Sequence, residues 1–452
     1  MSLSNITNYL NNVSKETIYP DFFNKLSDTN NLEIISIQTN LQSLLNDFYH
    51  IVYFTDNCLI TTNFFINQLG FKEIYYTGLE TGNKHIASRV VSSNNVIIEI
   101  VSSLDYSENY LLKTKPNYFE LMNLFCRDFL NAHGDGIGMI SFKSGDKKNS
   151  DQILNKINLR NGNYNCWKGD DKWSNFFIKI KGTNIYQLIL NNWEDHFNSF
   201  TEYKKIENNN IENKKIKLNG LSRIDHIVLN VPEGELTNTS LHFQELYQMF
   251  EFWKPKSLIK TSKTGLNTKV LSSFKKENNI NANVGVKFPI NEPLVVDSEH
   301  MGQIEEFLNY NNGSGIQHVA FVCQDIIKTV ENLTKYSSVQ FLKISSNEID
   351  NYYNKIWALL TECEKNEKND LDLQNFVKHL LENFDKIKSM HILVDINTEN
   401  EILLQIFTKN LNAKPGLFFE YIQRFRNQGF GEGNFNSLFK SIEEDQRLRG
   451  TL

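Results

Sequence analysis

The sequence predicts an α+β protein of four βαβββ modules that pair into two open barrels. The main support is that two strand motifs each occur twice. GDGIGMISFK (134–143) and GSGIQHVAFV (313–322) share one frame, and FYHIVYF (48–54) and RIDHIVLN (223–230) share another. After each His-Ile-Val strand come a polar turn, apolar residues at helical spacing and further alternating strands. Each motif therefore opens a module.

The modules and the segments between them give the expected domain organisation. The modules are expected at about 45–105, 130–195, 220–295 and 313–425. KKIENNNIENKKIKLN (204–219) is charged, rich in asparagine and without apolar periodicity, which is typical of a linker. We therefore expect an N-terminal domain over 1–203, the linker over 204–219 and a C-terminal domain over 220–452.

Two further segments have helical patterns. Spaced apolar residues over 345–390 predict helices inserted within the fourth module. The segment 433–450 predicts a C-terminal helix, and four apolar residues fall on one of its faces: Phe435, Leu438, Phe439 and Ile442.

Composition narrows the class of protein. A chain of 452 residues with 40% hydrophobic and 12% aromatic content predicts two or three globular domains. The formal charge of −6 is mild, so we expect no nucleic-acid or membrane partner. Five scattered cysteines without a CxxC pair indicate reduced thiols. The start MSLSNITNYLNN is unlike a secretory signal, and no apolar stretch approaches the roughly 20 residues of a membrane span. We expect a soluble cytoplasmic protein.

The repeats suggest a metal site in the C-terminal half. His226 and His318 begin equivalent strands, so pseudo-symmetry directs both side chains at one interior point. The closing strand GLFFEYIQRF (416–425) holds Glu420 among aromatic residues, where a carboxylate is costly to bury unless it is paired or bound to a cation. Two histidines and one carboxylate form the facial triad of non-haem Fe(II) oxygenases.

The N-terminal half lacks the same set of residues. It keeps His50, has Met139 at the second position, and its closing strand IYQLILNNW (185–193) contains no acid before Glu194. One ligand of three does not hold a metal at useful affinity. We therefore expect a scaffold without a metal site.

A structural interpretation competes with the metal site on pattern alone. Lone strand histidines are more often structural than ligating, and this interpretation is kept for His50, His85, His133, His196, His242, His300, His379 and His391. Glu420 could instead be an inward acid paired with a base such as Arg424. From the residues alone, both interpretations stay open.

Several long motifs in one order resemble a known family, the 4-hydroxyphenylpyruvate dioxygenases. They are NVP (230–232), GLNT (265–268), PINEP (289–293), QIEEFLNYNNGSGIQHVAF (303–321), LLQIFTK (403–409), FFEYIQR (418–424) and GFGEGNFNSLFKSIEEDQRLRG (429–450). Dense matches run from about residue 223 to the C-terminus, apart from 345–390. The N-terminal half matches only in its outline of modules.

The resemblance implies a vicinal-oxygen-chelate fold and an Fe(II) enzyme. Family members convert 4-hydroxyphenylpyruvate and O2 to homogentisate and CO2 in tyrosine breakdown, and they form homodimers or homotetramers. By the resemblance, the iron ligands are His226, His318 and Glu420, the same residues that the repeats indicate.

The resemblance also implies a set of substrate-binding residues. The aromatic walls are Phe407, Phe418, Phe430 and Phe435, and the polar contacts are Thr268, Asn291, Gln303, Gln317, Gln405 and Asn434. Those expected to act in catalysis are Asn291, Gln303, Gln405 and Phe435. Without the resemblance, the phenylalanines fit a core and the glutamines a surface. Thr268 stands where the family usually has serine, and Gln317 is expected to face away from the neighbouring His318 on a regular strand.

The C-terminal segment predicts a lid, and two other functions stay open. Glycines in GFGEG (429–433) flank Phe430 and suggest hinges for the helix that follows.

A 4-hydroxymandelate synthase would share fold, iron and substrate, but such enzymes have smaller aliphatic residues at the positions of Asn291 and Phe435. A catalytically idle small-molecule-binding relative is the other alternative, since the 345–390 insertion and Thr268 allow it.

Overall fold

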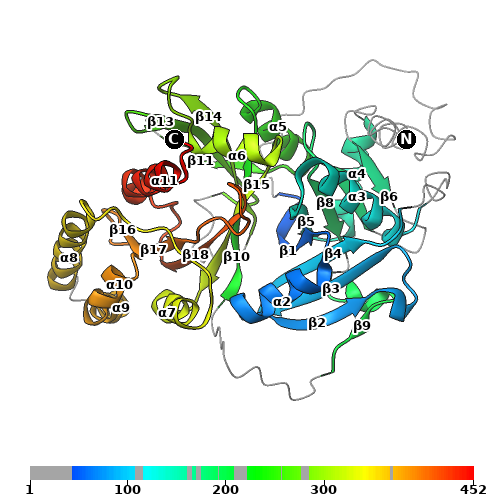
Figure 1. The fold of residues 1–452 in the computed structure, drawn as a ribbon, viewed down its shortest axis with the longest axis horizontal. Coiled ribbons are helices and arrows are strands. Elements are labelled where there is room, and N and C mark those ends of the chain that lie inside the picture. The colour runs from blue at the N-terminus through cyan, green and yellow to red at the C-terminus, as the bar shows by residue number, and fades with distance from the viewer. Residues whose placement is uncertain are drawn as a thin grey trace.

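The protein is described by a computed structural model, in which the two halves of the chain lie side by side (Figure 1). The described residues are 43–106, 116–159, 165–168, 175–191, 193–207, 221–255, 257–275, 285–366 and 370–452. Within them, the strands form two nine-stranded sheets that carry helices, as expected for an α+β protein. We call residues 45–205 the N-terminal half and residues 221–452 the C-terminal half. The start of the chain, which carried the expectation about a secretory signal, lies outside the described residues.

The first sheet belongs to the N-terminal half. Its strands lie in the order β6 (Cys166–Lys168), β7 (Phe176–Lys179), β8 (Tyr186–Leu190), β5 (Gly136–Ser144), β1 (Leu45–Phe54), β4 (Val96–Ser103), β3 (Ile86–Ser93), β2 (Lys72–Thr77) and β9 (Lys204–Lys205). The helices are α2 (Cys58–Leu69), α3 (Tyr118–His133) and α4 (Lys147–Leu159), with short 3₁₀ turns η2 (Leu79–Thr81) and η4 (Phe197–Ser199). Local sequence explains the ends of α2. Asn57 accepts the N–H of Ile60 at the start, and Gly70 ends the helix with a left-handed φ of 70°.

The second sheet belongs to the C-terminal half. Its strands lie in the order β11 (Phe250–Trp253), β13 (Thr264–Ser272), β14 (Lys287–Val295), β10 (Leu221–Asn230), β15 (Gly315–Cys323), β18 (Phe418–Phe425), β17 (Ile402–Phe407) and β16 (Leu393–Ile396), and β12 (Ile259–Lys260) pairs with β13. The helices around it are α5 (Leu236–Tyr247), α6 (Gln303–Asn311), α7 (Ile326–Tyr336) and α11 (Phe435–Arg449), which follows the 3₁₀ turn η6 (Glu432–Asn434).

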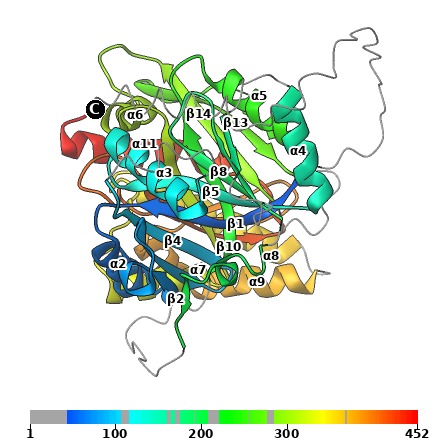
Figure 2. The ribbon, with the colours of Figure 1, turned by 90° about the vertical axis from the view of Figure 1, so that its right-hand side faces the viewer.

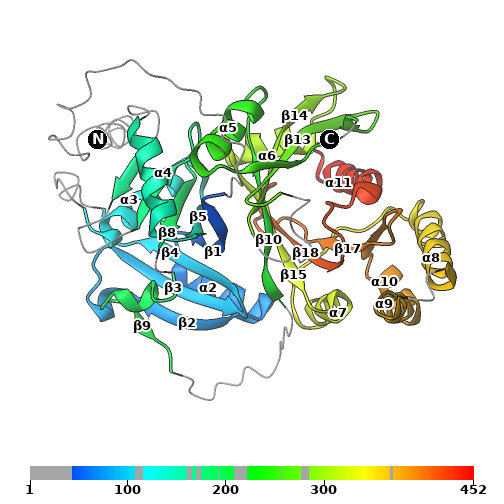
Figure 3. The same ribbon diagram turned by 180° about the vertical axis from the view of Figure 1, so that it is seen from behind.

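The predicted insertion is helical. It forms α8 (Ile349–Asn366), α9 (Leu371–Glu382) and α10 (Phe384–Ser389) between α7 and β16. Figures 1 and 3 show these helices at the edge of the C-terminal half that faces away from the N-terminal half. Their apolar residues Tyr353, Leu360, Val377 and Leu380 are buried, so the insertion extends the core of this half.

The two halves share the same irregularity in their central strand pairs. In β1–β5 the pairing shifts register at Tyr49 and at Gly138, and in β10–β15 it shifts at the equivalent Asp225 and Gln317. Each extra residue forms a β-bulge, which bends the strand and redirects side chains near it. The repeat seen in the sequence therefore extends to the bulges.

The halves pack through buried polar and apolar contacts, and helices α4 and α5, one from each half, lie next to each other (Figure 2). Gln187 of β8 accepts hydrogen bonds from His242 (2.8 Å) and Tyr247 (2.7 Å) of α5. The expected linker 204–219 begins as an edge strand, because Lys204 and Lys205 pair with Tyr76 and Tyr75 of β2, and residues 208–220 lie outside the described residues. Within the described parts of the chain, no helix has the length and apolar character needed to cross a membrane.

Candidate metal centre and substrate cavity

Three neighbouring strands, β10, β15 and β18, carry the predicted metal ligands. In the register of the sheet, His226 lies opposite Ala320, and Ala320 lies opposite Glu420. His318 precedes Ala320 by two residues, so its side chain emerges on the same face of the sheet as that of Ala320. The small Ala320 leaves room for the two flanking side chains to meet above it. The register thus brings the predicted residues together.

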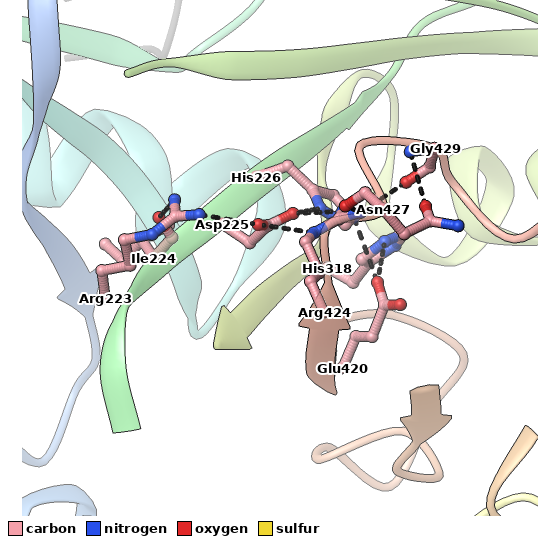
Figure 4. Close-up of polar contacts among 9 residues, drawn as sticks. All are labelled: Arg223, Ile224, Asp225, His226, His318, Glu420, Arg424, Asn427 and Gly429. Carbon is pink, nitrogen blue, oxygen red and sulfur yellow. Dashed lines mark hydrogen bonds and ion pairs between the residues drawn. The ribbon is translucent and has the colours of Figure 1, made fainter. Parts of the chain in front are cut away.

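The three side chains converge closely (Figure 4). The Nε2 atom of His226 lies 3.0 Å from Oε2 of Glu420, and the Nε2 atom of His318 lies 3.5 Å from the same oxygen. The candidate ligand atoms all lie within 4.8 Å of one another. His226 and Glu420 are buried, and only a small part of His318 is exposed.

The second ring nitrogen of each histidine has its own partner. Nδ1 of His226 lies 2.8 Å from a carboxylate oxygen of Asp225, and Nδ1 of His318 lies 3.0 Å from Oε1 of Gln317. Both partners are acceptors, so each Nδ1 carries a proton, which leaves each Nε2 as the nitrogen that could bind a cation. Asp225 and Gln317 are both bulged residues, which explains how side chains adjacent to the histidines reach their rings. Gln317 therefore does not face away from His318 as a regular strand predicts.

Neighbouring groups keep the carboxylates of Glu420 and Asp225 ionised. Burial alone would raise the pKa of Glu420, but His226 and His318 outweigh burial and lower this pKa to about 2. Burial likewise opposes ionisation of Asp225, yet Arg424, Lys287 and other basic groups hold its pKa well below the usual value. Burial lowers the pKa of His318 in spite of Glu420, which favours the neutral ring.

The donor set fits a divalent transition metal. Two imidazole nitrogens and one carboxylate on one side of a cavity form the facial arrangement of mononuclear non-haem iron sites, with positions left for other ligands. His226 Nε2, His318 Nε2 and a Glu420 oxygen are the atoms that could hold such an ion. Among the described residues, no other group of three or more potential ligands converges in this way.

The equivalent place in the N-terminal half has different residues. His50, Met139 and Leu188 occupy the positions that correspond to His226, His318 and Glu420. His50 is instead held by Glu99, at 3.4 Å, and by the hydroxyl of Ser141, also at 3.4 Å. The apolar Met139 and Leu188 are fully buried.

A cavity of about 110 Å³ opens beside the triad. Its walls include every predicted aromatic residue and all but one of the predicted polar residues: Thr268, Asn291, Gln303, Gln317, Gln405, Phe407, Phe418, Phe430 and Phe435. The exception is Asn434, which is buried under α8 and accepts a hydrogen bond from the Tyr352 hydroxyl (2.8 Å). The Nδ2 group of the same side chain is buried and has no hydrogen-bond partner among the described residues, and the substrate contact of Asn434 stays a prediction.

Helix α11 covers one side of the cavity. The four residues predicted to share a face, Phe435, Leu438, Phe439 and Ile442, all line the cavity. Gly431, just before this helix, has a φ of +77°, and a Cβ there would lie 2.1 Å from Oε1 of Gln405. Only glycine therefore fits this hinge position beside Gln405.

Two polar side chains of the cavity are well placed for a ligand. Oε1 of Gln405 is buried and has no hydrogen-bond partner among the described residues. Asn291 donates from Nδ2 to Asn230 (3.2 Å) and lies opposite Thr268 across β13 and β14. A buried amide oxygen without a partner is costly, so a bound polar group would compensate for it.

Some residues of the site were not predicted. Trp253, Ile259, Leu266, Val270 and Pro289 line the cavity, and Asp225 holds His226. An acid directly before a strand histidine, as in RIDHIVL, was the one available signal for Asp225. The alternative pairing of Glu420 with Arg424 is wrong, because the Arg424 guanidinium binds both carboxylate oxygens of Asp225 at 3.0 and 2.7 Å.

Comparisons with known proteins agree with this site. No family model matches the chain. Curated 4-hydroxyphenylpyruvate dioxygenases do: that of Aspergillus fumigatus is 31% identical over 89% of this chain and 93% of its own length, and that of Neurospora crassa is 30% identical over 94% and 98%. The Sus scrofa protein of the same name is 28% identical over 90% of this chain and 92% of its own.

Solved structures show the same fold. A triple mutant of 4-hydroxymandelate synthase from Streptomyces coelicolor matches with a TM-score of 0.63 at 19% identity, over 89% of this chain and 99% of that chain. A fusion protein of a xylose isomerase-like TIM barrel and a 4-hydroxyphenylpyruvate dioxygenase matches with a TM-score of 0.58 at 16% identity, over 90% of this chain and 53% of that chain.

Fold and relatives together identify the class and then the family. The protein is a non-haem Fe(II) dioxygenase with the vicinal-oxygen-chelate fold. Within that class, the chain belongs to the 4-hydroxyphenylpyruvate dioxygenase family, since relatives at 30–31% identity cover about nine-tenths of it or more.

Proposed function

We propose that this protein catalyses the Fe(II)- and O2-dependent conversion of 4-hydroxyphenylpyruvate to homogentisate and CO2. The single observation that carries the proposal is the convergence of His226, His318 and Glu420 beside an aromatic cavity, in a chain of this family. Bound there, Fe(II) supplies open coordination positions and electrons for the activation of O2.

The chain's own residues hold the ion and orient the substrate. His226 and His318 present Nε2 lone pairs, and Glu420 supplies an ionised carboxylate. A 2-oxo acid has adjacent carboxylate and keto oxygens, which suit chelation at the remaining positions. The buried Oε1 of Gln405 can accept a hydrogen bond from the phenol of the substrate. Asn291, Gln303, Gln317 and Thr268 offer further polar contacts from the cavity wall.

Aromatic side chains would fix the plane of the substrate ring. The Phe418 ring stacks on His318 with centroids 4.8 Å apart, and Phe430 meets His226 edge-on at 5.3 Å. Phe435 and Phe430 both contact Trp253, with ring centroids 6.0 and 5.9 Å away. Aromatic rings therefore form much of the cavity wall beside the ligand atoms, which suits an aromatic substrate.

Helix α11 acts as a lid in this proposal. Its inner face lines the cavity, and Gly431 provides a hinge before it. A closed lid excludes water from the reacting atoms and protects oxidising species from side reactions.

Product analysis tests the proposed reaction. Purified protein is incubated anaerobically with Fe(II) and 4-hydroxyphenylpyruvate, O2 is added, and products are separated by chromatography while O2 uptake is recorded. Homogentisate with matching O2 consumption is expected. Hydroxymandelate as the main product would overturn the proposal in favour of benzylic hydroxylation, and no O2 uptake would favour a binding protein without catalysis.

We further propose a cytoplasmic, symmetric homodimer or homotetramer that is divided into domains at 1–203 and 220–452 with a linker between them. Closed symmetric assemblies are the usual state of soluble oligomeric enzymes. Light scattering coupled to size-exclusion chromatography measures the mass in solution, and a monomer of 52.6 kDa would overturn the assembly.

A further inference from the structure

One arginine links the strands that carry the candidate metal ligands to the hinge of the lid (Figure 4). Arg424 lies on β18, four residues after Glu420, and its side chain is only 5% exposed. Its Nε and Nη2 groups donate to the two carboxylate oxygens of Asp225, at 3.0 and 2.7 Å. Oδ2 of Asp225 also lies 2.8 Å from Nδ1 of His226. Arg424 therefore fixes the carboxylate that orients a ligand ring.

The remaining terminal nitrogen of Arg424 holds the hinge. Nη1 donates to the backbone carbonyls of Asn427 (3.2 Å) and Gly429 (2.6 Å). The Asn427 side chain closes the same turn by accepting the Gly429 N–H at 2.7 Å. This turn leads directly into Phe430, whose ring meets His226, and into the left-handed Gly431. Both ends of the turn are thus tied to one guanidinium.

A simpler role for Arg424 would be to neutralise the buried Asp225. Arg223 is available for that role, because its Nη2 lies 3.3 Å from Oδ1 of the same carboxylate. The other hydrogen bond of Arg223 goes to the carbonyl of Ile224 in its own strand, at 3.4 Å. The two arginines share Asp225 as a partner, but among the contacts described for them only those of Arg424 reach the hinge turn. Their contacts separate charge neutralisation from coupling to the hinge.

We propose that Arg424 is a positioning residue that couples the orientation of His226 to closure of the hinge at 427–431. This inference rests on the proposed metal site. When the hinge turn is in the described position, it holds the guanidinium, the guanidinium holds Asp225, and Asp225 holds the ring of His226. Opening the lid withdraws two acceptors from Arg424 and loosens that chain. By reciprocity, a metal ion bound at His226 favours the closed hinge.

The test compares Arg424→Lys with Arg223→Lys in the full-length protein. The lysine keeps the charge but cannot bind two carboxylate oxygens and two carbonyls at once. Co(II) affinity is measured by titration of its visible absorption, and hydrogen exchange is measured over residues 427–435 with and without Co(II). For wild type, Co(II) is expected to slow exchange in this segment.

Arg424→Lys is expected to lower Co(II) affinity by about 10–100-fold and to remove the protection of the hinge by Co(II). Arg223→Lys is expected to change affinity by no more than about threefold and to leave hinge protection as in wild type. A second variant, Asn427→Ala, loosens the turn without touching Asp225, and it too is expected to weaken Co(II) binding. It keeps the test decisive if Arg424→Lys folds poorly by circular dichroism.

Three results separate the possible failures. Normal Co(II) affinity in a folded Arg424→Lys, or in Asn427→Ala with a measurably looser hinge, would overturn the coupling. Equal losses in the two arginine variants would also overturn it, because they would trace to the shared partner Asp225 and not to the hinge. Failure of wild type to bind Co(II) would overturn the proposed metal centre itself, which is a different result.

Discussion

The two halves use the same bulged strand pair with different residues, and the difference shows what turns a scaffold into a metal site. β1–β5 and β10–β15 shift register at equivalent residues, so both backbones direct side chains at an interior point. In the C-terminal half three candidate ligands meet there, whereas in the N-terminal half Met139 and Leu188 fill the space and Glu99 holds His50. The fold supplies the geometry, and a few side chains decide its use.

The surroundings of the two sites differ as well. His226 and His318 face a cavity lined by phenylalanines and by α11. His50 lies fully buried among Tyr49, His196 and Phe197, whose rings lie 5.0 to 5.6 Å from its own. An empty space beside a polar cluster permits ligand exchange, and a packed aromatic shell does not. Function therefore depends on packing around the strands as much as on the ligands.

The sharpest test of this comparison exchanges equivalent residues for alanine. His318→Ala is expected to lower Co(II) affinity by more than about 100-fold, because altering only a partner of a ligand already costs about 10–100-fold. Met139→Ala should keep the metal and lose about 2–5 kcal/mol of stability through the cavity it leaves. Metal titration and urea unfolding measure both quantities. Metal loss in Met139→Ala, or retention in His318→Ala, would contradict the assignment of roles to the halves.

Truncation of the lid tests the second difference. Deletion of 430–452 removes Phe430 and the cavity face of α11 but none of the three ligands. Homogentisate formation is expected to fall below detection, while Co(II) binding stays measurable, since the substrate slot opens to water. Leu448→Ala, at an exposed position of α11, serves as the control and should turn over like wild type. Normal turnover by the truncated enzyme would refute the lid.

A smaller effect on the stability of the lid is expected from the contact at the C-terminal end of α11. Arg449 donates two hydrogen bonds of 2.8 Å to the buried Glu306 of α6. The same helix α6 contributes Gln303 to the cavity wall. Glu306→Gln is expected to weaken this contact by about 2 kcal/mol and to speed amide exchange in α11 by roughly tenfold or more. Glu444→Gln, which removes an exposed partner of Arg447 within the helix, is the matched control. Equal exchange rates in the two variants would exclude Glu306 as an anchor of α11.

Sequence repetition predicted that His226, His318 and Glu420 would converge, because side-chain alternation and strand pairing are local rules. Equivalent positions in repeated strands must face the same side of a sheet, so His226 and His318 could be paired without coordinates. The aromatic wall and the inner face of α11 followed from long motifs and helical spacing, and these residues do line the cavity.

Bulges and long-range pairs could not be predicted in the same way. One extra residue in a strand has no sequence signature, so the turn of Gln317 toward His318 was missed. Arg424 and Asp225 are separated by 199 positions, and only the assembled sheet brings them together. Asn434 belongs to one of the motifs that carry the resemblance, but the motif does not reveal that Tyr352 of the insertion donates a hydrogen bond to its side chain.

The weakest expected effect concerns the contact that joins the halves. His242 of α5 donates from Nε2 to Oε1 of Gln187 of β8 in a buried interface, and burial lowers the pKa of His242 to about 3. An unfolded histidine has a pKa near 6.5, so between these values only the unfolded chain takes up the proton. The contribution of neutral His242 to the free energy of unfolding is therefore fully present above about pH 6.5 and is lost as pH falls toward 3.

Replacing His242 with glutamine should therefore flatten the acid side of the stability profile. Urea unfolding at pH 7, 6 and 5 should show wild type losing about 1 kcal/mol per pH unit more than His242→Gln below pH 6, because one proton-binding site of the unfolded chain is gone. A glutamine amide can still donate to Gln187, so the two proteins should differ least at pH 7. His379→Gln, at an exposed position of α9, controls for loss of a histidine as such and should keep the wild-type slope. Parallel profiles for wild type and His242→Gln would mean that protonation of His242 does not contribute to the loss of stability at low pH. The metal site and the scaffold would then respond to acid through other groups.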